Sequence, residues 1–441
     1  MFLPAACLVT AGKSELWDAL RSIAAWLCYL ESNDMESSLT WLDFSEHERR
    51  RMLDVIALFG ESGTRDELGI GSIRDGFADL LFPGTSTIQT RARYFLFVPW
   101  IYSILEGKPT PSAKVANNAR KLETALIYSI EETADTDGLI GKLAKENVLR
   151  LPSDIYWMGL ATWGIRVFVG SREQYYRSLD YFYIRRKGRS TRPKDFRDES
   201  WIESELTNWH SGLPEIPDDF PESATFALTR TEAEYLRERV VVKHPRSLLA
   251  YILREEHRVE SVEWCWDLAN VVTEPLREQL QHGQNFSEIM LGAQLLYNFM
   301  LAELRPWAEK IDDYQARLQE WRHLMTSKRS SLHNWDRTRF WQIVWQGNPR
   351  ISTPARSFVN CWIDLVLKSA HGDDMTQNAA ARKLVSAREH QLKKGLSRLY
   401  SRRALELWNG AAGAGQLDLR WSAARRILND ILEGLEQPSD A

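Results

Sequence analysis

Apolar residues recur at helical spacing along most of this chain, whereas the alternation typical of β-strands is scarce. One such stripe runs through Met52, Val55 and Phe59. It follows Ser45 and Glu48, which have the spacing of a helix capping box. The pattern predicts a mainly α fold, a multi-helical and irregular bundle with few or no strands. Helices are expected near 72–82, 85–106, 111–133, 285–325 with a break at Pro306, 376–408 and 420–435.

The linker-like stretch 185–225 is the only clear interruption of this pattern. It is first basic and then acidic and rich in proline, as expected for irregular structure. The sequence therefore predicts an N-terminal helical domain over 35–184 and a C-terminal helical domain over 226–441. Residues 1–34 are expected to be an upstream leader, with translation starting at Met35. The alternative is an N-terminal helix that docks on the core.

Composition and motifs exclude several classes of protein. The chain of 441 residues is long enough to bury a core, and its four cysteines contain no C-x-x-C pair. No apolar run reaches the length of a membrane span, so we expect a cytoplasmic protein without a membrane partner. P-loop, H-E-x-x-H, H-x-K-x-x-x-x-D and G-x-S-x-G motifs are all missing from the sequence. We therefore predict no cofactor and no metal site, and the sequence identifies no reaction.

The densest polar cluster lies in residues 64–94. A helix start is expected at 85–87, where free backbone N–H groups and the helix dipole would favour an anion. The candidates for binding a phosphate or another anion are Thr85, Ser86, Thr87, Arg91 and Arg93. The candidates for a polar network beside them are Arg65, Asp66, Arg74, Asp75 and Asp79. The alternative is structural: the hydroxyls cap the helix and the Arg and Asp side chains form internal ion pairs.

A second candidate surface is the C-terminal stretch Arg382–Arg426, which holds eleven Lys and Arg against three acidic residues. The chain as a whole has a net charge of −4, so this stretch is an island of positive charge. On one continuous helix, some of these cations would form a winding stripe that could follow a phosphate backbone. The candidates for nucleic-acid binding are Lys383, Lys394, Arg398, Arg402, Arg403 and Arg425. The alternative is a solvated helix face.

Two long runs of sequence resemble a known family. They are SLTWLDFSEHERRRMLDVIALFGESGTRDELGIGSIRDGFADLLFPGTSTIQTRARYFLFVPWIY (38–102) and ALELWNGAAGAGQLDLRWSAARRILNDIL (404–432). Both are similar to an uncharacterised bacterial family catalogued as domain of unknown function 6361. The resemblance implies an association with defence genes, near helicases and phospholipase-D-type nucleases. It supplies no catalytic positions.

Two hypotheses of function follow. The first is a non-catalytic component of an anti-phage or mobile-element defence system that binds nucleic acid, a nuclease or a helicase. The second is an unrecognised enzyme acting on nucleic acid or nucleotides, with its site in residues 64–94. Convergence of Asp66, Asp75 and Asp79 in an open pocket with Arg91 or Arg93 would favour the enzyme.

Overall fold

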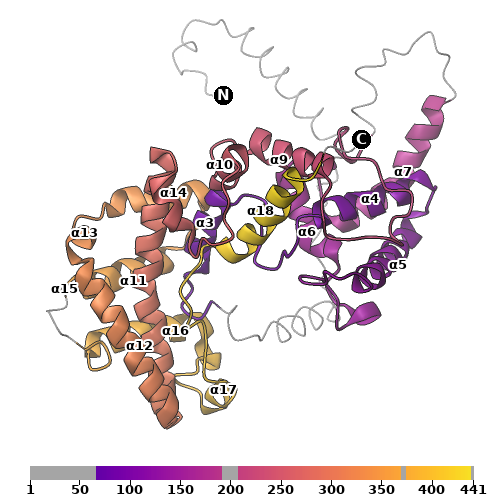
Figure 1. Cartoon of the computed structure of the whole chain (residues 1–441). Coiled ribbons are helices and arrows are strands. Elements are labelled where there is room, and N and C mark those ends of the chain that lie inside the picture. Colours follow the sequence, from indigo (N-terminus) through magenta and orange to yellow (C-terminus); the bar gives the residue numbers. More distant parts are fainter. Residues whose placement is uncertain (1–65, 191–206, 369–373, 439–441) are drawn as a thin grey trace, which may run out of the picture. The chain divides into compact units, whose positions relative to one another are not determined.

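Helices dominate the part of the chain that the computed structural model describes, which is residues 66–190, 207–368 and 374–438 (Figure 1). No strand occurs within these ranges, where Arg166 and Trp209 form an isolated bridge. The prediction of a mainly α, multi-helical fold is thereby confirmed. Among the same residues, no helix combines the length and apolar character needed to cross a membrane.

The helices follow one another along the chain as follows. They are α3 (Gly71–Leu81), α4 (Tyr94–Gly107), α5 (Ser112–Glu131), η1 (Lys145–Asn147), α6 (Pro152–Thr162), α7 (Arg172–Ser190), α9 (Arg230–Lys243), α10 (Leu248–Glu255), η3 (Cys265–Asn270), α11 (Glu274–Leu304), α12 (Ala308–Ser327), α13 (Arg329–His333), α14 (Arg337–Gly347), α15 (Thr353–Lys368), α16 (Ala379–Lys393), η4 (Lys394–Leu396), α17 (Arg402–Glu406) and α18 (Trp421–Leu435).

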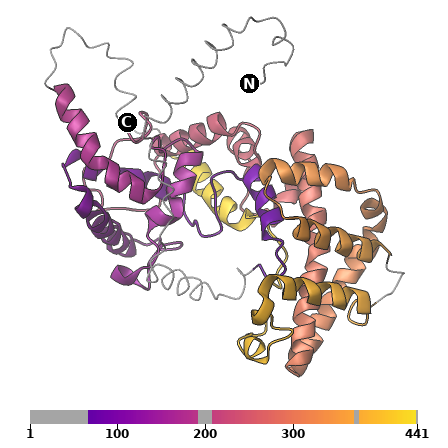
Figure 2. The same cartoon turned by 180° about the vertical axis from the view of Figure 1, so that it is seen from behind.

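The long helix α11 packs against α12, and both views of the fold show the two helices side by side (Figures 1 and 2). The predicted break at Pro306 separates them, because proline cannot continue the hydrogen bonding of a helix. Their close approach depends on Gly292, since a Cβ atom there would lie 2.3 Å from the ring of Trp321. The α11–α12 pair provides one wall of the cavity described below.

Helices from distant parts of the sequence pack together. α18 contacts α9 and α10, while α3 contacts α14, α10 and α11. All described residues belong to one compact unit, in which segments before and after 185–225 are in contact. The division into domains at 185–225 stays a prediction. The proposed start at Met35, the helix after Ser45 and residues 191–206 of the linker lie outside the described residues.

Two expected helices differ from the structure. The helix expected over 85–106 begins only at Tyr94, and the helix expected over 376–408 is divided into α16, η4 and α17. In both places side chains bind backbone groups that a helix would have used. Those at 85–93 come from distant parts of the chain, whereas the one at 376–408 is Glu389, within the stretch itself. These partners are described with the site residues.

Candidate functional site

Residues 85–93 connect α3 to α4 and do not form a helix. The prediction that Thr85–Thr87 stand at a helix start is therefore wrong. The Thr85 hydroxyl is buried and donates to the carbonyl oxygen of Phe82 at 2.7 Å. Thr87 is exposed, and the backbone N–H of Ser86 donates to a nearby glutamine side chain. The expected anion cradle at a helix N-terminus is consequently not formed by these three residues.

The Arg91 side chain is held by carboxylates. Its Nε lies 3.0 Å from both carboxylate oxygens of Asp430, and its Nη1 donates to Asp135 at 2.6 Å. Asp430 also accepts from the backbone N–H of Ala92 at 2.7 Å. Burial raises the pKa of Asp430 to about 6, and the bonds from Arg91 and Ala92 act in the opposite direction. The backbone N–H of Arg91 also donates to the Tyr156 hydroxyl. These tertiary hydrogen bonds explain why the segment is not helical.

The Arg93 side chain is also bound by groups of the protein itself. Its guanidinium donates to the carboxylate of Glu232 at 2.7 Å and to the carbonyl of Thr225 at 2.9 Å. Arg91 and Arg93 are 9% and 8% exposed, so neither presents a free guanidinium to solvent. The geometry favours internal ion pairs, the structural alternative, for both arginines.

The acidic residues of the cluster separate into two groups. Asp66 caps α3, because its two carboxylate oxygens accept the backbone N–H groups of Ile70 and Gly71, each at 2.7 Å. Arg65, the residue before it, lies outside the described residues.

Asp75 and Asp79 form ion pairs with Arg420, the residue before α18. Arg420 reaches Asp79 at 2.8 Å and Asp75 at 3.6 Å, and Arg74 also pairs with Asp75 at 2.9 Å. The three aspartates therefore do not converge with Arg91 or Arg93, and this arrangement disfavours the enzyme hypothesis.

The basic C-terminal stretch does not form the predicted continuous helix. α16 ends at Lys393, and Lys394 has a φ of 51°, in the left-handed region. The buried carboxylate of Glu389 explains the turn that follows. It accepts the backbone N–H groups of Arg398 and Leu399 at 2.7 and 3.2 Å. The predicted winding stripe on one helix is therefore wrong.

Part of this stretch is structural. Arg398, one of the predicted nucleic-acid contacts, lies beside Glu67 with only 11% of its side chain exposed and with 2.8 Å between Nη1 and Oε1. Lys393 pairs with the same Glu67, and Arg388 donates to the backbone carbonyl of Leu68 at 2.8 Å. These cations bind the segment before α3 to α16 and the turn after it.

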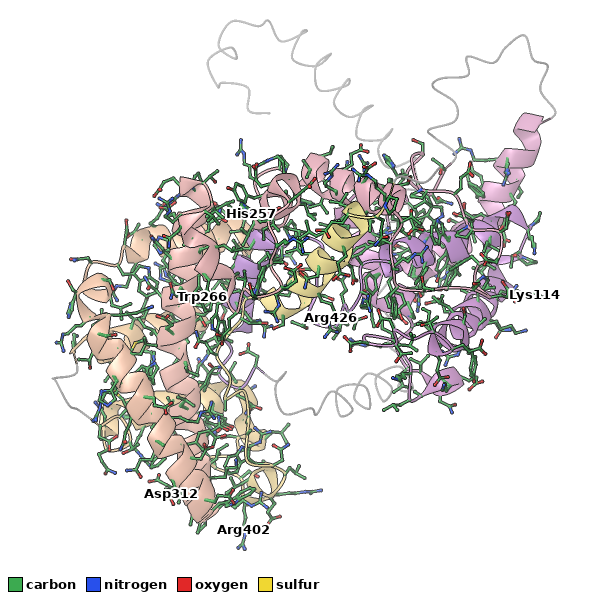
Figure 3. The ribbon with its side chains drawn as sticks, viewed as in Figure 1. Lys114, His257, Trp266, Asp312, Arg402 and Arg426 are labelled. Atoms are coloured by element: carbon green, nitrogen blue, oxygen red, sulfur yellow. The ribbon has the colours of Figure 1, made fainter. Side chains whose placement is uncertain are left out.

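The remaining cations point outward. Lys383, Lys394, Arg402 and Arg403 are all exposed, and we call these four residues the exposed basic set. The Arg402 side chain is 93% exposed, and Figure 3 shows it extending away from the ribbon. The last candidate, Arg425, is half-buried and donates to the carbonyl of Val262 at 2.6 Å.

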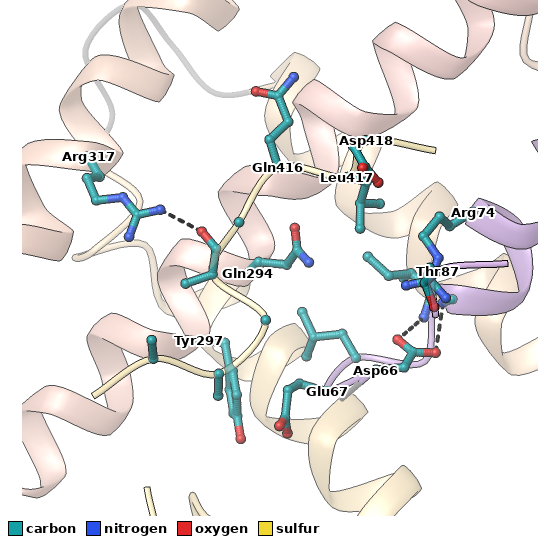
Figure 4. A pocket seen from close by; sticks show the side chains of 18 residues that line it. Asp66, Glu67, Arg74, Thr87, Gln294, Tyr297, Arg317, Gln416, Leu417 and Asp418 are labelled. Atoms are coloured by element: carbon teal, nitrogen blue, oxygen red, sulfur yellow. Dashed lines mark hydrogen bonds between the residues drawn. The ribbon is translucent and has the colours of Figure 1, made fainter. Parts of the chain in front are cut away.

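A cavity of about 420 Å³ brings together three predicted site residues, Asp66, Arg74 and Thr87 (Figure 4). Its other walls are α11, α12 and the glycine-rich loop, residues 410–418. The residues that line it are Asp66, Glu67, Leu68, Ile70, Gly71, Arg74, Thr87, Gln294, Tyr297, Arg317, Ala411, Ala412, Gly413, Ala414, Gly415, Gln416, Leu417 and Asp418. The sequence pattern identified 410–418 only as a turn between helices, and it missed Gln294 and Arg317.

The cavity lining combines charged and polar side chains. It contains no His and no Cys, and burial raises the pKa of the Tyr297 hydroxyl far above neutral pH. In the described part of the chain, no group of three or more His, Cys, Asp or Glu side chains is placed to hold a metal ion. The lining supplies two arginines, three carboxylates and two carboxamides, those of Gln294 and Gln416.

Comparison with known proteins gives one result. The model of DUF6361, a family of unknown function, matches residues 36–434, and the chain belongs to this family. No curated protein and no solved structure matches the chain.

Proposed function

We propose that this protein is a non-catalytic component of a bacterial anti-phage or mobile-element defence system. It acts in the cytoplasm and binds nucleic acid through the exposed basic set. The observation that carries the binding part is the division of cations within 382–403: Arg388, Lys393 and Arg398 are internal, whereas the exposed basic set faces solvent. The defence part rests on the family resemblance and its association with helicase and nuclease genes.

The exposed basic set is available to phosphate groups. Lys383, Lys394 and Arg403 form no ion pair with the described residues, and Arg402 has only an exposed contact with Glu406 at 3.5 Å. Exposed contacts of this type are worth little in water, so a phosphate can replace Glu406. Binding through cations alone releases counterions and carries no sequence information.

An aromatic side chain lies beside these cations. Tyr400 is 63% exposed, and its ring packs against His390 at a centroid distance of 4.7 Å. Exposed aromatic rings next to cations stack on the bases of single strands. This arrangement supports binding of single-stranded as well as duplex nucleic acid.

Exposed apolar side chains on the same segment support a protein partner, such as a helicase or nuclease subunit. Leu396 and Leu407 are 76% and 80% exposed. Exposed apolar side chains with a polar rim are typical of surfaces that bind other proteins.

A second candidate function is an enzyme acting on nucleic acid or nucleotides. It is favoured by the presence of Asp66, Arg74 and Thr87 in one cavity. Incubation of the protein with labelled DNA, RNA and nucleotides in the presence of Mg²⁺ tests it. Turnover that is lost in Asp66→Asn would support an enzyme, and the non-catalytic proposal would then be wrong.

Replacing the whole exposed basic set by glutamine tests the binding proposal. The variant removes four positive charges, and the affinity for a labelled duplex should fall by at least about tenfold at low salt. The matched control removes four other exposed cations, Lys108, Lys114, Lys121 and Arg246, and should bind nearly as the wild type does. Equal losses in both variants would show that net charge, rather than this surface, determines binding.

A further inference from the structure

The glycine-rich loop that lines the cavity is fixed by side chains of α11 and α12. The Tyr314 hydroxyl donates to the carbonyl of Gly410 at 2.7 Å, and Arg317 donates to the carbonyl of Ala414 at 2.6 Å. Asn298 binds both backbone groups of Ala412, each at 2.8 Å. The cavity wall is therefore held in place before any ligand arrives, which lowers the entropic cost of binding.

One polar side chain on this face lacks a partner. Gln294 lies one helical turn before Asn298 on α11 and is 8% exposed. Its Oε1 is buried, and no donor among the described residues reaches it. Figure 4 shows the carboxamide pointing into the cavity. An unpaired buried amide oxygen destabilises a fold, so its presence in a cavity indicates an external hydrogen-bond donor.

The charges around the cavity are unevenly distributed. Arg317 has no carboxylate partner among the described residues, since its bond is to a carbonyl oxygen. Figure 4 shows Asp66 and Asp418 on the other side, with Gln294 between them and Arg317. Both aspartates already cap backbone N–H groups, but Asp66 uses only two of the roughly four acceptor positions of a carboxylate. One end of the cavity thus suits an anionic group, and the other suits N–H donors.

We propose that this cavity binds a small molecule of nucleotide size that carries an anionic group at Arg317 and N–H donors at Gln294 and Asp66. The size argument is the volume, about 420 Å³, which lies in the range of roughly 300–1,000 Å³ typical of small-molecule pockets. A free phosphate ion would leave most of that space and the Gln294 oxygen unused. This proposal is independent of the exposed basic set and of nucleic-acid binding.

The test uses the full chain and two probes, AMP and inorganic phosphate. AMP combines a phosphate with an exocyclic amine, so it should bind by calorimetry and raise the melting temperature, whereas inorganic phosphate should do neither. Gln294→Leu should weaken AMP binding by at least about tenfold. Without ligand, its melting temperature should equal or exceed that of the wild type, because an unpaired buried oxygen has been removed.

Gln279→Leu is the matched control. It lies on the same helix and also removes an unpaired buried amide oxygen, but it does not line the cavity. It should leave AMP binding unchanged. Arg317→Gln gives a second test and should also weaken AMP binding. No binding of AMP to the wild type, binding of inorganic phosphate alone, or equal AMP affinity in Gln294→Leu would each overturn the proposal.

Discussion

Arg91 and Asp430 are 339 positions apart in the sequence, yet the Nε of Arg91 lies 3.0 Å from both carboxylate oxygens of Asp430. Both side chains are buried, with 11% and 7% of their surfaces exposed. Through this pair the segment before α4 is bound to α18, near the end of the described chain. Arg91, a candidate anion ligand in the sequence analysis, is therefore part of the core.

Removing one partner of this pair should destabilise the protein strongly. Asp430→Ala leaves the Arg91 guanidinium buried without its main counter-ion, and the free energy of unfolding should fall by about 3–5 kcal/mol. The double variant Arg91→Met with Asp430→Leu should recover much of that loss, because no buried charge remains. Urea denaturation of the two variants measures this. A loss below about 1 kcal/mol in Asp430→Ala would mean that water replaces the carboxylate at little cost.

Glu123 should make stability depend on pH near neutrality. It is fully buried, its carboxylate accepts the N–H and the hydroxyl of Ser153 at 2.8 Å, and burial raises its pKa to about 7. Its ordinary value is 4.5, so between these two pH values the folded state binds the proton more tightly than the unfolded state. Unfolding free energy should therefore fall as pH rises through this window, by at most about 3 kcal/mol.

The control for this effect is Glu123→Gln, which keeps the shape of the side chain but cannot titrate. Its unfolding free energy should vary less between the two pKa values than that of the wild type. Identical pH profiles for both proteins would show that the carboxyl of Glu123 does not titrate in this window.

Glu389 should have the opposite effect at acid pH. Burial favours its neutral form, but the hydrogen bonds from Ser397 and Arg398 outweigh burial and lower its pKa below 4.5. The stabilisation that Glu389 provides is therefore present above that pH and is lost as pH falls through its folded-state pKa. Glu389→Gln should lower the unfolding free energy at neutral pH by about 1–3 kcal/mol and reduce the dependence on acid pH. A variant as stable as the wild type at neutral pH would mean that the turn after α16 does not depend on this carboxylate.

Helix ends that are determined by neighbouring residues could be predicted from the sequence. The stop of α3 at Pro83–Gly84 and the break at Pro306 follow from proline and glycine, which act on their own neighbours. The end of α16 and the late start of α4 could not be predicted in this way. They depend on Glu389 and Asp430, whose positions are known only once the chain has folded.

In the candidate sites, too, the sequence could not predict which polar side chains are paired within the fold. Charge counting identified the basic stretch 382–426 but could not separate Arg398, which faces Glu67, from Arg402, which faces solvent. Gln294 had one usable signal, since it is a polar residue within the apolar run from Met290 to Leu296. That pattern alone does not distinguish an unpaired amide from a paired one such as Asn298.

The central claim is that the exposed basic set binds the phosphate backbone of nucleic acid. Titration of labelled duplex DNA at several salt concentrations, with the wild type and the quadruple glutamine variant, tests it most directly. Each phosphate contact contributes about 0.9 to the slope of log affinity against log salt, so the variant should have a slope flatter by roughly three to four units. Absence of binding by the wild type at low salt, or the same slope in both proteins, would contradict the claim.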